Sequence, residues 1–286
     1  MVNRRGALKW TMAGFSAALF GNLPKVDMDY MEKKRQFRHS VSRWCFSKYS
    51  LGDLVEICKS LGIDSIELLN AEDYKLVIKS GLQCAIANGS PLGITKGFNN
   101  PELHQQLLMD YSRLIPEAAD NGVSQVICFS GNRNGISDEQ GLEYCLKGLD
   151  KVVKIAEENR ITLVMELLNS KVDHHDYQCD HTSWGVQLSE RLGSPNFRLL
   201  YDIYHMQIME GDVIRTIREN HSHICHYHTA GVPGRNEINA SQELNYPAIM
   251  TAIAETGFKG YVGQEFVPAS SDPVKSLKEA IELCNV

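Results

Sequence analysis

The sequence predicts a single α/β domain over residues 36–286, in which eight parallel strands alternate with eight helices and close into a barrel. From residue 37 onward, short apolar runs take turns with amphipathic stretches, which is the pattern of repeated strand–helix units. Two runs, 125–130 and 161–166, are almost wholly apolar, as expected of parallel strands that helices cover on both faces. Eight such units fill about 250 residues, the usual size of a (β/α)8 barrel.

The expected strands are short runs that end close to a polar residue. They cover residues 39–42, 65–69, 83–87, 125–130, 161–166, 197–202, 224–228 and 261–265. The alternative for such a pattern is a doubly wound open sheet, which favours a glycine-rich phosphate-binding turn after the first strand. Ser42-Arg43-Trp44-Cys45 stands there instead, so the sequence favours the closed barrel.

Three of the expected helices begin with a recognisable cap. Ser50 precedes one apolar stripe, and Ser137 opens a second helix as part of a capping box. Asp272 precedes Pro273, so a capping residue stands directly before a first-turn proline. The other expected helices cover residues 72–80, 101–121, 183–192, 212–220 and 246–256.

Residues 1–35 predict a leader and linker that precede the barrel. Arg4 and Arg5 stand before Leu8-Lys9 and a mildly apolar stretch that is too short to span a bilayer, which is typical of a twin-arginine export signal. The alternative is a basic tail. A working leader predicts a periplasmic or exported protein, and otherwise the protein is cytoplasmic. No stable membrane insertion is expected in either case.

The charge balance favours a small-molecule substrate over a nucleic-acid partner. The net charge is -6, and no dense basic run follows the first 35 residues. The eight cysteines are scattered singly without a C-x-x-C pair, which predicts buried free thiols in place of disulfides or a structural zinc site. The sequence leaves the oligomeric state open, a homo-oligomer included.

Potential metal ligands end the last four expected strands. They are Glu166, Asp202, His228 and Glu265, and each follows an apolar run. The active site of such a barrel lies at the carboxyl ends of its strands, so these four side chains should meet at its mouth. Each residue alone is ordinary at a strand end, but the same position in four consecutive units favours a divalent cation among repelling carboxylates. Mostly oxygen ligands with one imidazole suit Mg²⁺, Mn²⁺ or Co²⁺.

Further polar residues are expected at the rim of the same mouth. His205 follows Asp202 by three positions, and Arg235 lies in the glycine-containing loop after His228. An arginine on a rim loop either binds a substrate carboxylate through paired hydrogen bonds or is an ordinary surface residue. Glu67 and Asn70, at the end of the second strand, are also positioned to face the pocket.

Several motifs resemble those of the hydroxypyruvate isomerases, a family within the xylose isomerase-like TIM barrel superfamily that also includes the ketose 3-epimerases. The similarity runs from about residue 37 to the C-terminus. The motifs lie at residues 92–101 (LGITKGFNNP), 165–170 (MELLNS), 201–207 (YDIYHMQ), 226–235 (HYHTAGVPGR) and 263–266 (GQEF).

The resemblance implies roles for six residues. Glu166 and Glu265 match the acid/base pair of hydroxypyruvate isomerases, while His205 and Arg235 match positions that contact substrate. The residues matching Glu166, Asp202, His228 and Glu265 hold the divalent metal in the epimerases. His228 departs from the pattern, because some hydroxypyruvate isomerases carry glutamine there.

The expected activity is the metal-dependent conversion of hydroxypyruvate to tartronate semialdehyde by proton transfer through an enediolate. A ketose 3-epimerase or another sugar isomerase would use the same site with a longer substrate, and Trp44, Phe98 and Arg235 are expected to set the pocket length. A non-catalytic exported sugar-binding protein would bind its ligand without turnover. A repair endonuclease on the same barrel would need several zinc ions and a basic face, which the charge disfavours.

Overall fold

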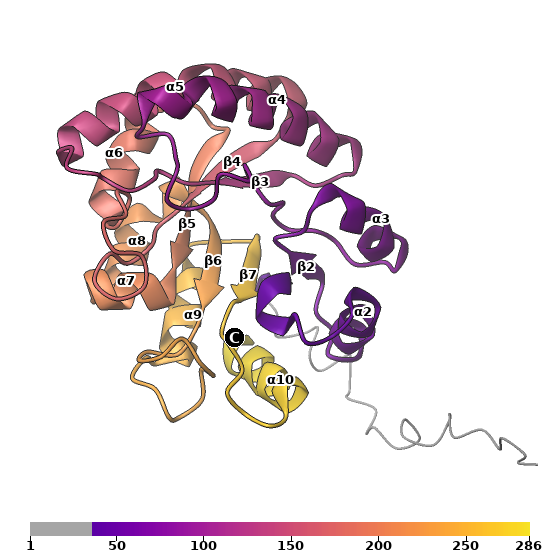
Figure 1. Cartoon of the computed structure of the whole chain (residues 1–286). Helices are drawn as coiled ribbons and strands as arrows, with labels where there is room; N and C mark the ends of the chain where they lie inside the picture. Colours follow the sequence, from indigo (N-terminus) through magenta and orange to yellow (C-terminus); the bar gives the residue numbers. More distant parts are fainter. Residues whose placement is uncertain (1–35) are drawn as a thin grey trace, which may run out of the picture. The chain divides into compact units, whose positions relative to one another are not determined.

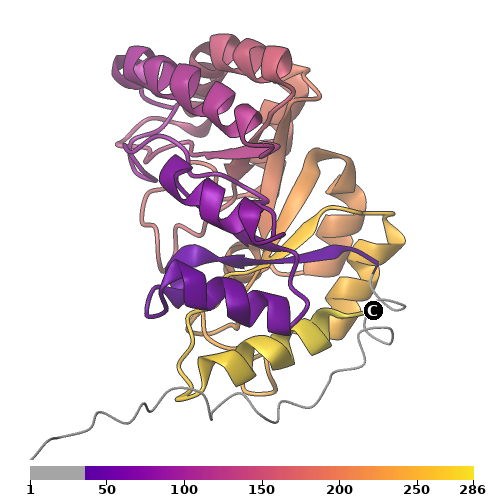
Figure 2. The ribbon, with the colours of Figure 1, turned by 90° about the vertical axis from the view of Figure 1, so that its right-hand side faces the viewer.

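The computed structural model describes residues 36–286, so the leader and linker expected over residues 1–35 lie outside the described residues. The strands of the described part are β1 (Arg38–Ser42), β2 (Ser65–Glu67), β3 (Gln125–Cys128), β4 (Thr162–Glu166), β5 (Phe197–Asp202), β6 (Ile224–Thr229) and β7 (Tyr261–Gln264). They form one curled, wholly parallel sheet in the order β2-β1-β7-β6-β5-β4-β3 (Figure 1). Figure 2 shows β1 beside the yellow β7, its hydrogen-bonded neighbour.

The expected third strand is wrong as a regular strand, so the sheet in the described residues has seven strands and not eight. Gln83 and Ala87 still form isolated parallel bridges to β2 and β3, the two edges of the sheet. Between them, the Ala85 N–H donates to the Ser65 hydroxyl at 2.8 Å. In a regular parallel ladder the Ala85 N–H would donate to a backbone carbonyl, but here it donates to the Ser65 side chain. The segment from Gln83 to Ala87 is therefore irregular.

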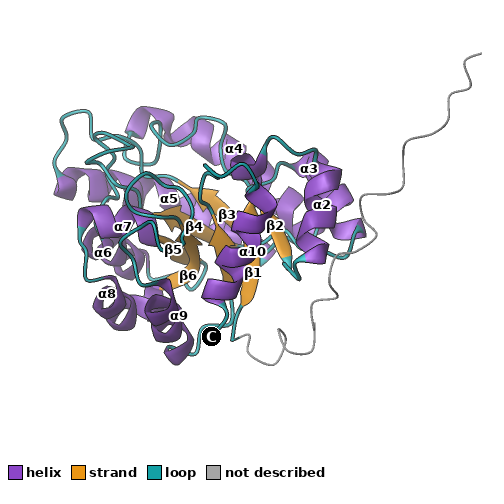
Figure 3. Cartoon of the chain, turned by 90° about the horizontal axis from the view of Figure 1, so that it is seen from below, coloured by secondary structure: helices purple, strands orange, loops and turns teal. Residues whose placement is uncertain are grey.

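Helices alternate with the strands and surround them, as the view from below shows (Figure 3). In the described residues they are α2 (Leu51–Ser60), α3 (Ala71–Lys79), α4 (His104–Asp120), α5 (Asp138–Asn159), α6 (Thr182–Leu192), α7 (Ile203–Met209), α8 (Val213–Asn220), α9 (Tyr246–Glu255) and α10 (Pro273–Cys284). The sequence missed α7, which begins directly after β5.

The three expected caps are confirmed. The Ser50 side chain accepts from the N–H three residues on, and Ser137 and Asp272 do the same at the starts of α5 and α10. Each satisfies an N–H that the first helical turn leaves without a partner.

Apolar side chains from neighbouring strands fill the middle of the sheet. Ile127, Val164 and Leu200, from β3, β4 and β5, pack with Ile86 of the irregular segment. All eight cysteines are free, and most are buried, as the scattered pattern predicted. Among the described helices, none combines the length and the hydropathy needed to cross a bilayer.

Candidate metal and substrate site

The fold brings the four predicted ligands together at one edge of the sheet. Glu166 and Asp202 end β4 and β5, His228 lies in β6, and Glu265 follows β7. Asp202 stands opposite His228, which stands opposite Gly263 on the next strand. Each of the four offers one ligand atom within 4.8 Å of the others, and all four are buried. We call Glu166, Asp202, His228 and Glu265 the ligand quartet.

The His228 ring lies between carboxylates on both sides. Its Nδ1 is 3.2 Å from Glu166 Oε1 and 3.1 Å from Glu265 Oε2. Its Nε2 is 2.7 Å from Glu67 Oε1. Burial alone would lower the pKa of His228, but the Glu265 and Glu67 carboxylates outweigh it and raise this pKa well above its usual value. Nδ1 is thus the ring nitrogen that faces the rest of the quartet.

Two carboxyls of the quartet show that negative charge is crowded here. Burial raises the pKa of Asp202 to about 8, against the attraction of Arg235. Burial and the Glu265 charge also raise the pKa of Glu166. Asp202 Oδ2 is fully buried and has no hydrogen-bond partner, which is costly for a carboxylate oxygen. Three carboxylates and one imidazole with such an orphaned oxygen fit a divalent cation.

Glu265 differs from Glu166 because both of its oxygens accept a hydrogen bond from a donor. The Trp44 indole N–H donates to Oε1 at 2.9 Å, and Arg235 Nη2 donates to Oε2 at 2.6 Å. Burial raises the pKa of Glu265, but His228 and Arg235 hold it well below its usual range. Among the described residues, the Glu166 carboxylate has one hydrogen-bond partner, His228.

Arg235 reaches the quartet from a tightly bent loop after β6. Its backbone is left-handed, with φ of 58°, and its carbonyl accepts from the Val267 N–H at 2.7 Å. The guanidinium lies 5.1 Å from the Trp44 ring centroid and 5.6 Å from that of Tyr204. Two aromatic faces and the Glu265 carboxylate therefore fix the guanidinium for which the family resemblance implies a contact with substrate.

His205 presents an N–H beside the quartet. Its Nδ1 accepts from the Asn169 backbone N–H at 3.2 Å, and a backbone N–H can only donate, so the ring proton of neutral His205 is on Nε2. Burial, with the Arg235 charge, lowers the pKa of His205 well below its usual value. Nε2 is buried without a hydrogen-bond partner, 3.7 Å from Asp202 Oδ2.

The unpredicted helix α7 positions this histidine. Asp202 caps α7 by accepting from the His205 N–H at 3.1 Å. The spacing of three residues between a capping aspartate and His205 was the available signal. One residue therefore both ends β5 at the quartet and starts the helix that holds His205.

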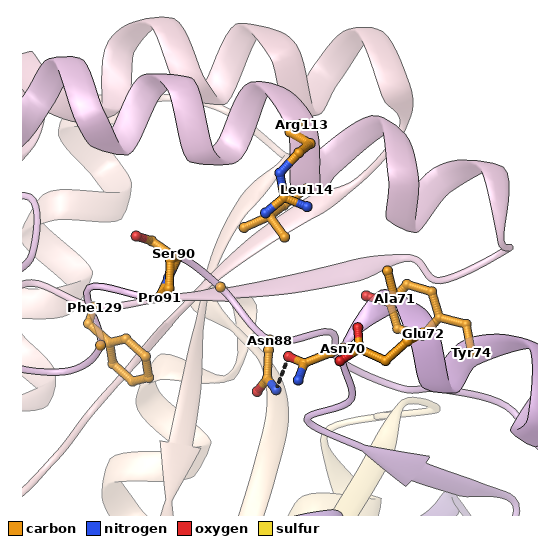
Figure 4. A pocket seen from close by; sticks show the side chains of 12 residues that line it. Asn70, Ala71, Glu72, Tyr74, Asn88, Ser90, Pro91, Arg113, Leu114 and Phe129 are labelled. Atoms are coloured by element: carbon orange, nitrogen blue, oxygen red, sulfur yellow. Dashed lines mark hydrogen bonds between the residues drawn. The ribbon is translucent and has the colours of Figure 1, made fainter.

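Other expected positions fall outside this site. Phe98 is fully buried and packs on Tyr111 with ring centroids 5.5 Å apart, so it is a core residue and does not set the pocket length. Asn70 hydrogen-bonds Asn88 at 2.8 Å in the lining of a separate cavity of about 370 Å³ (Figure 4). That cavity lies between the start of α3 and α4, and no member of the quartet lines it.

Two buried residues lie behind His228: Glu67, which the sequence analysis expected to face the pocket, and His226, to which it gave no role. Glu67 contacts His228, and His226 Nε2 lies 3.1 Å from Glu67 Oε2. His226 stands two positions before His228, so the period of a strand puts both rings on one face, with centroids 5.1 Å apart. That alternation was the signal that sequence reasoning passed over.

Most of the described residues match a known protein family. A family model described as xylose isomerase-like TIM barrel matches residues 55–285. The hydroxypyruvate isomerase of Escherichia coli K12 is 28% identical over 151 residues, which is 52% of this chain and 58% of the relative. The 2-oxo-tetronate isomerase of Cupriavidus necator is 31% identical over 123 residues, 43% of this chain and 46% of the relative. The chain thus spans about half the length of these curated relatives.

A solved structure supports the fold at larger coverage. The crystal structure of an AP endonuclease of family 2 from Brucella melitensis superposes with a TM-score of 0.76 and 22% identity. The match covers 85% of this chain and 96% of that one. At this identity the likeness concerns the fold alone, since one barrel carries many chemistries.

Proposed function

The chain belongs to the xylose isomerase-like TIM barrel family, and from that premise we propose that it is a divalent-metal-dependent isomerase of a small hydroxy-carbonyl compound, hydroxypyruvate in the first place. The observation that carries the proposal is the convergence of the ligand quartet within 4.8 Å. His205 and Arg235 border it with hydrogen-bond donors. The relatives named as hydroxypyruvate and 2-oxo-tetronate isomerases support the same reaction class.

The quartet would hold Mg²⁺, Mn²⁺ or Co²⁺, and the bound cation supplies positive charge that stabilises a negative substrate oxygen. The reaction breaks a C–H bond at C3 of hydroxypyruvate. The electron pair forms the C2–C3 double bond of an enediolate, and the C2 carbonyl oxygen becomes negative. The proton of the C3 hydroxyl then passes to the negative C2 oxygen, a proton is returned to C2, and the C3 oxygen becomes the aldehyde carbonyl.

Hydrogen bonding distinguishes the two glutamates in this reaction. Glu166 takes the proton from C3, because its carboxylate has one hydrogen-bond partner while both oxygens of Glu265 are occupied. Glu265 serves the return of the proton at C2. The Nε2–H of His205 donates to a substrate oxygen, and Arg235 holds the substrate carboxylate.

The test is turnover on a substrate panel. Hydroxypyruvate, 2-oxo-tetronate and ketohexoses are each offered with Mg²⁺, Mn²⁺ or Co²⁺, and deuterium uptake from solvent is followed. Glu166→Gln and Glu265→Gln should each abolish turnover without unfolding the protein. Near-normal rates in either variant, on every accepted substrate, would refute the acid/base assignment.

A second candidate, a ketose 3-epimerase or another sugar isomerase, is favoured by the pairing of Arg235 with Glu265 at 2.6 Å. A substrate without a carboxylate leaves this ion pair intact. Turnover of ketohexoses and none of the hydroxy-keto acids would select this candidate. Binding of sugars without any deuterium uptake would instead select the non-catalytic sugar-binding alternative.

The predicted leader bears on the cellular compartment in which the protein acts. We propose export to the periplasm by the twin-arginine route, from Arg4-Arg5 and the apolar stretch that follows. Replacing both arginines by lysine should keep the protein in the cytoplasm, and fractionation of cells would measure this. Equal distribution of the two proteins would contradict the export proposal.

A further inference from the structure

Glu67 is a buried charge that the proposed reaction does not use. It ends β2, is fully buried, and contacts side chains from two other strands. Its Oε1 accepts from the Ser42 hydroxyl at 3.2 Å and lies 2.7 Å from His228 Nε2, while its Oε2 lies 3.1 Å from His226 Nε2. An isolated carboxylate is costly at such depth, and the two hydrogen-bond partners of Oε1, Ser42 and His228, stabilise Glu67 in a defined orientation, whereas Oε2 has no hydrogen-bond partner.

The neighbouring strand leaves space for this contact. Gly263 of β7 stands opposite His228 in the sheet. A Cβ at Gly263 would lie 2.2 Å from Glu67 Oε1 and 2.9 Å from His228 Cδ2. Every other residue type would therefore push Glu67 away from the histidine. Glycine thus stands at the position of β7 that the Glu67 carboxylate approaches.

The two nitrogens of His228 face different groups. Nδ1 faces Glu166 and Glu265 of the quartet, and Nε2 faces Glu67. A histidine that binds a metal through one nitrogen keeps its proton on the other, and a carboxylate that accepts this proton fixes the ring orientation. The geometry of Glu67 is that of such an acceptor.

We propose that Glu67 is a positioning residue for the metal site: it accepts the Nε2–H of His228 and so presents Nδ1 to the cation. The Ser42 hydroxyl, which donates to Oε1, helps to hold Glu67 in place. The inference rests on the proposed function, because it assumes that the quartet binds a divalent cation. Glu67 itself contacts neither cation nor substrate.

A competing interpretation is a second cation held by Glu67, His226 and His228, whose ligand atoms also lie within 4.8 Å of one another. The 2.7 Å separation of Oε1 and Nε2 is typical of a charge-assisted hydrogen bond. In addition, two cations would require His228 to give up both ring protons. The observations therefore favour one cation with a hydrogen-bonded histidine.

The experiment measures Co²⁺ binding to the metal-stripped full-length protein by calorimetry, together with turnover as Co²⁺ is raised. The wild type should bind one Co²⁺ per chain. Glu67→Gln and Gly263→Ala should weaken Co²⁺ binding by about 10–100-fold, the usual effect of losing a partner behind a metal-binding histidine. Excess Co²⁺ should restore kcat in both variants with KM unchanged, which a general loss of structure would not allow.

The matched control is Asp180→Asn. Asp180 is also a buried carboxylate, but it pairs with Arg133 at 2.9 Å and belongs to neither cluster. Its variant should bind Co²⁺ as the wild type does. If Glu67→Gln fails to fold, the Co²⁺ affinities of Gly263→Ala and Glu67→Asp are compared with that of the wild type in its place.

Three results would overturn the inference, and they differ from one another. No Co²⁺ binding by the wild type removes the proposed metal dependence itself. Wild-type affinity in Glu67→Gln and Gly263→Ala leaves the metal site standing and removes only the role of Glu67. Two Co²⁺ ions per wild-type chain, with one lost in Glu67→Gln, assign Glu67 to a second metal site.

Discussion

Acidification should weaken the binding of a divalent cation to the ligand quartet, because the cation has to displace protons there. Burial lowers the pKa of His228, but the Glu265 and Glu67 carboxylates outweigh it and raise this pKa well above its usual value. Burial raises the pKa of Asp202 to about 8. Asp202 thus carries a proton at neutral pH in the metal-free protein, and the raised pKa of His228 favours its protonated ring, whereas the cation binds the deprotonated form of each group.

The size of the effect follows from the number of displaced protons. Each displaced proton changes the free energy of binding by about 1.4 kcal/mol per pH unit, or about tenfold in Kd. Below the Asp202 pKa of about 8, the displaced Asp202 proton alone should lower the Kd about tenfold for each unit by which the pH rises. Above that pKa the Asp202 proton has already left, so the dependence of the Kd on pH should become weaker.

Calorimetry in two buffers of different ionisation enthalpy measures the released protons directly. At about pH 7, cation binding should release protons, and Asp202→Asn should release about one fewer than the wild type. A Kd that stays constant between about pH 6 and 8, with no proton release, would refute the reasoning. It would mean that neither His228 nor Asp202 is protonated in the metal-free site.

Three further predictions concern stability and turnover. In metal-free protein, the raised pKa of Asp202 contributes stability that is lost as pH rises from about 4 through about 8, at up to about 1.4 kcal/mol per pH unit. Asp202→Asn should flatten this slope when the free energy of unfolding is measured with denaturant at each pH. His205→Ala should lower kcat/KM by about 10²–10³ while Co²⁺ affinity stays unchanged, since it removes the N–H that is proposed to contact substrate. Unchanged kinetics would contradict this role of His205. Phe98→Ala should cost about 3–5 kcal/mol of unfolding free energy and leave KM unchanged, because Phe98 is fully buried; a raised KM would return it to the pocket.

Features that depend on short stretches of sequence were predictable. The caps at Ser50, Ser137 and Asp272 involve an N–H only three residues away, so the local sequence suffices. The meeting of the quartet was also predictable, because parallel strands of one sheet end at the same edge. Neither case needs the exact register between distant segments.

Features that depend on contacts across the barrel were not predictable. The Ser65 hydroxyl interrupts the ladder at Ala85, although the sequence around Ala85 reads as an ordinary strand. The approach of Glu67 to His228 joins residues 161 positions apart and depends on Gly263 in a third strand. Such contacts follow from the register of several strands at once, and that register is a property of the folded sheet.

Because Arg235 is paired with Glu265, the proposed binding of a substrate carboxylate to Arg235 would replace one carboxylate partner of the guanidinium by another. An incoming anion competes for the guanidinium with a carboxylate that the fold already keeps at 2.6 Å. A neutral ligand offers Arg235 no competing negative charge, so Glu265 stays paired with Arg235 when such a ligand binds. In the proposed function, an anionic substrate that binds Arg235 takes one donor away from Glu265, while the Trp44 N–H still donates to Oε1, so substrate binding and the partial release of Glu265 occur in the same step.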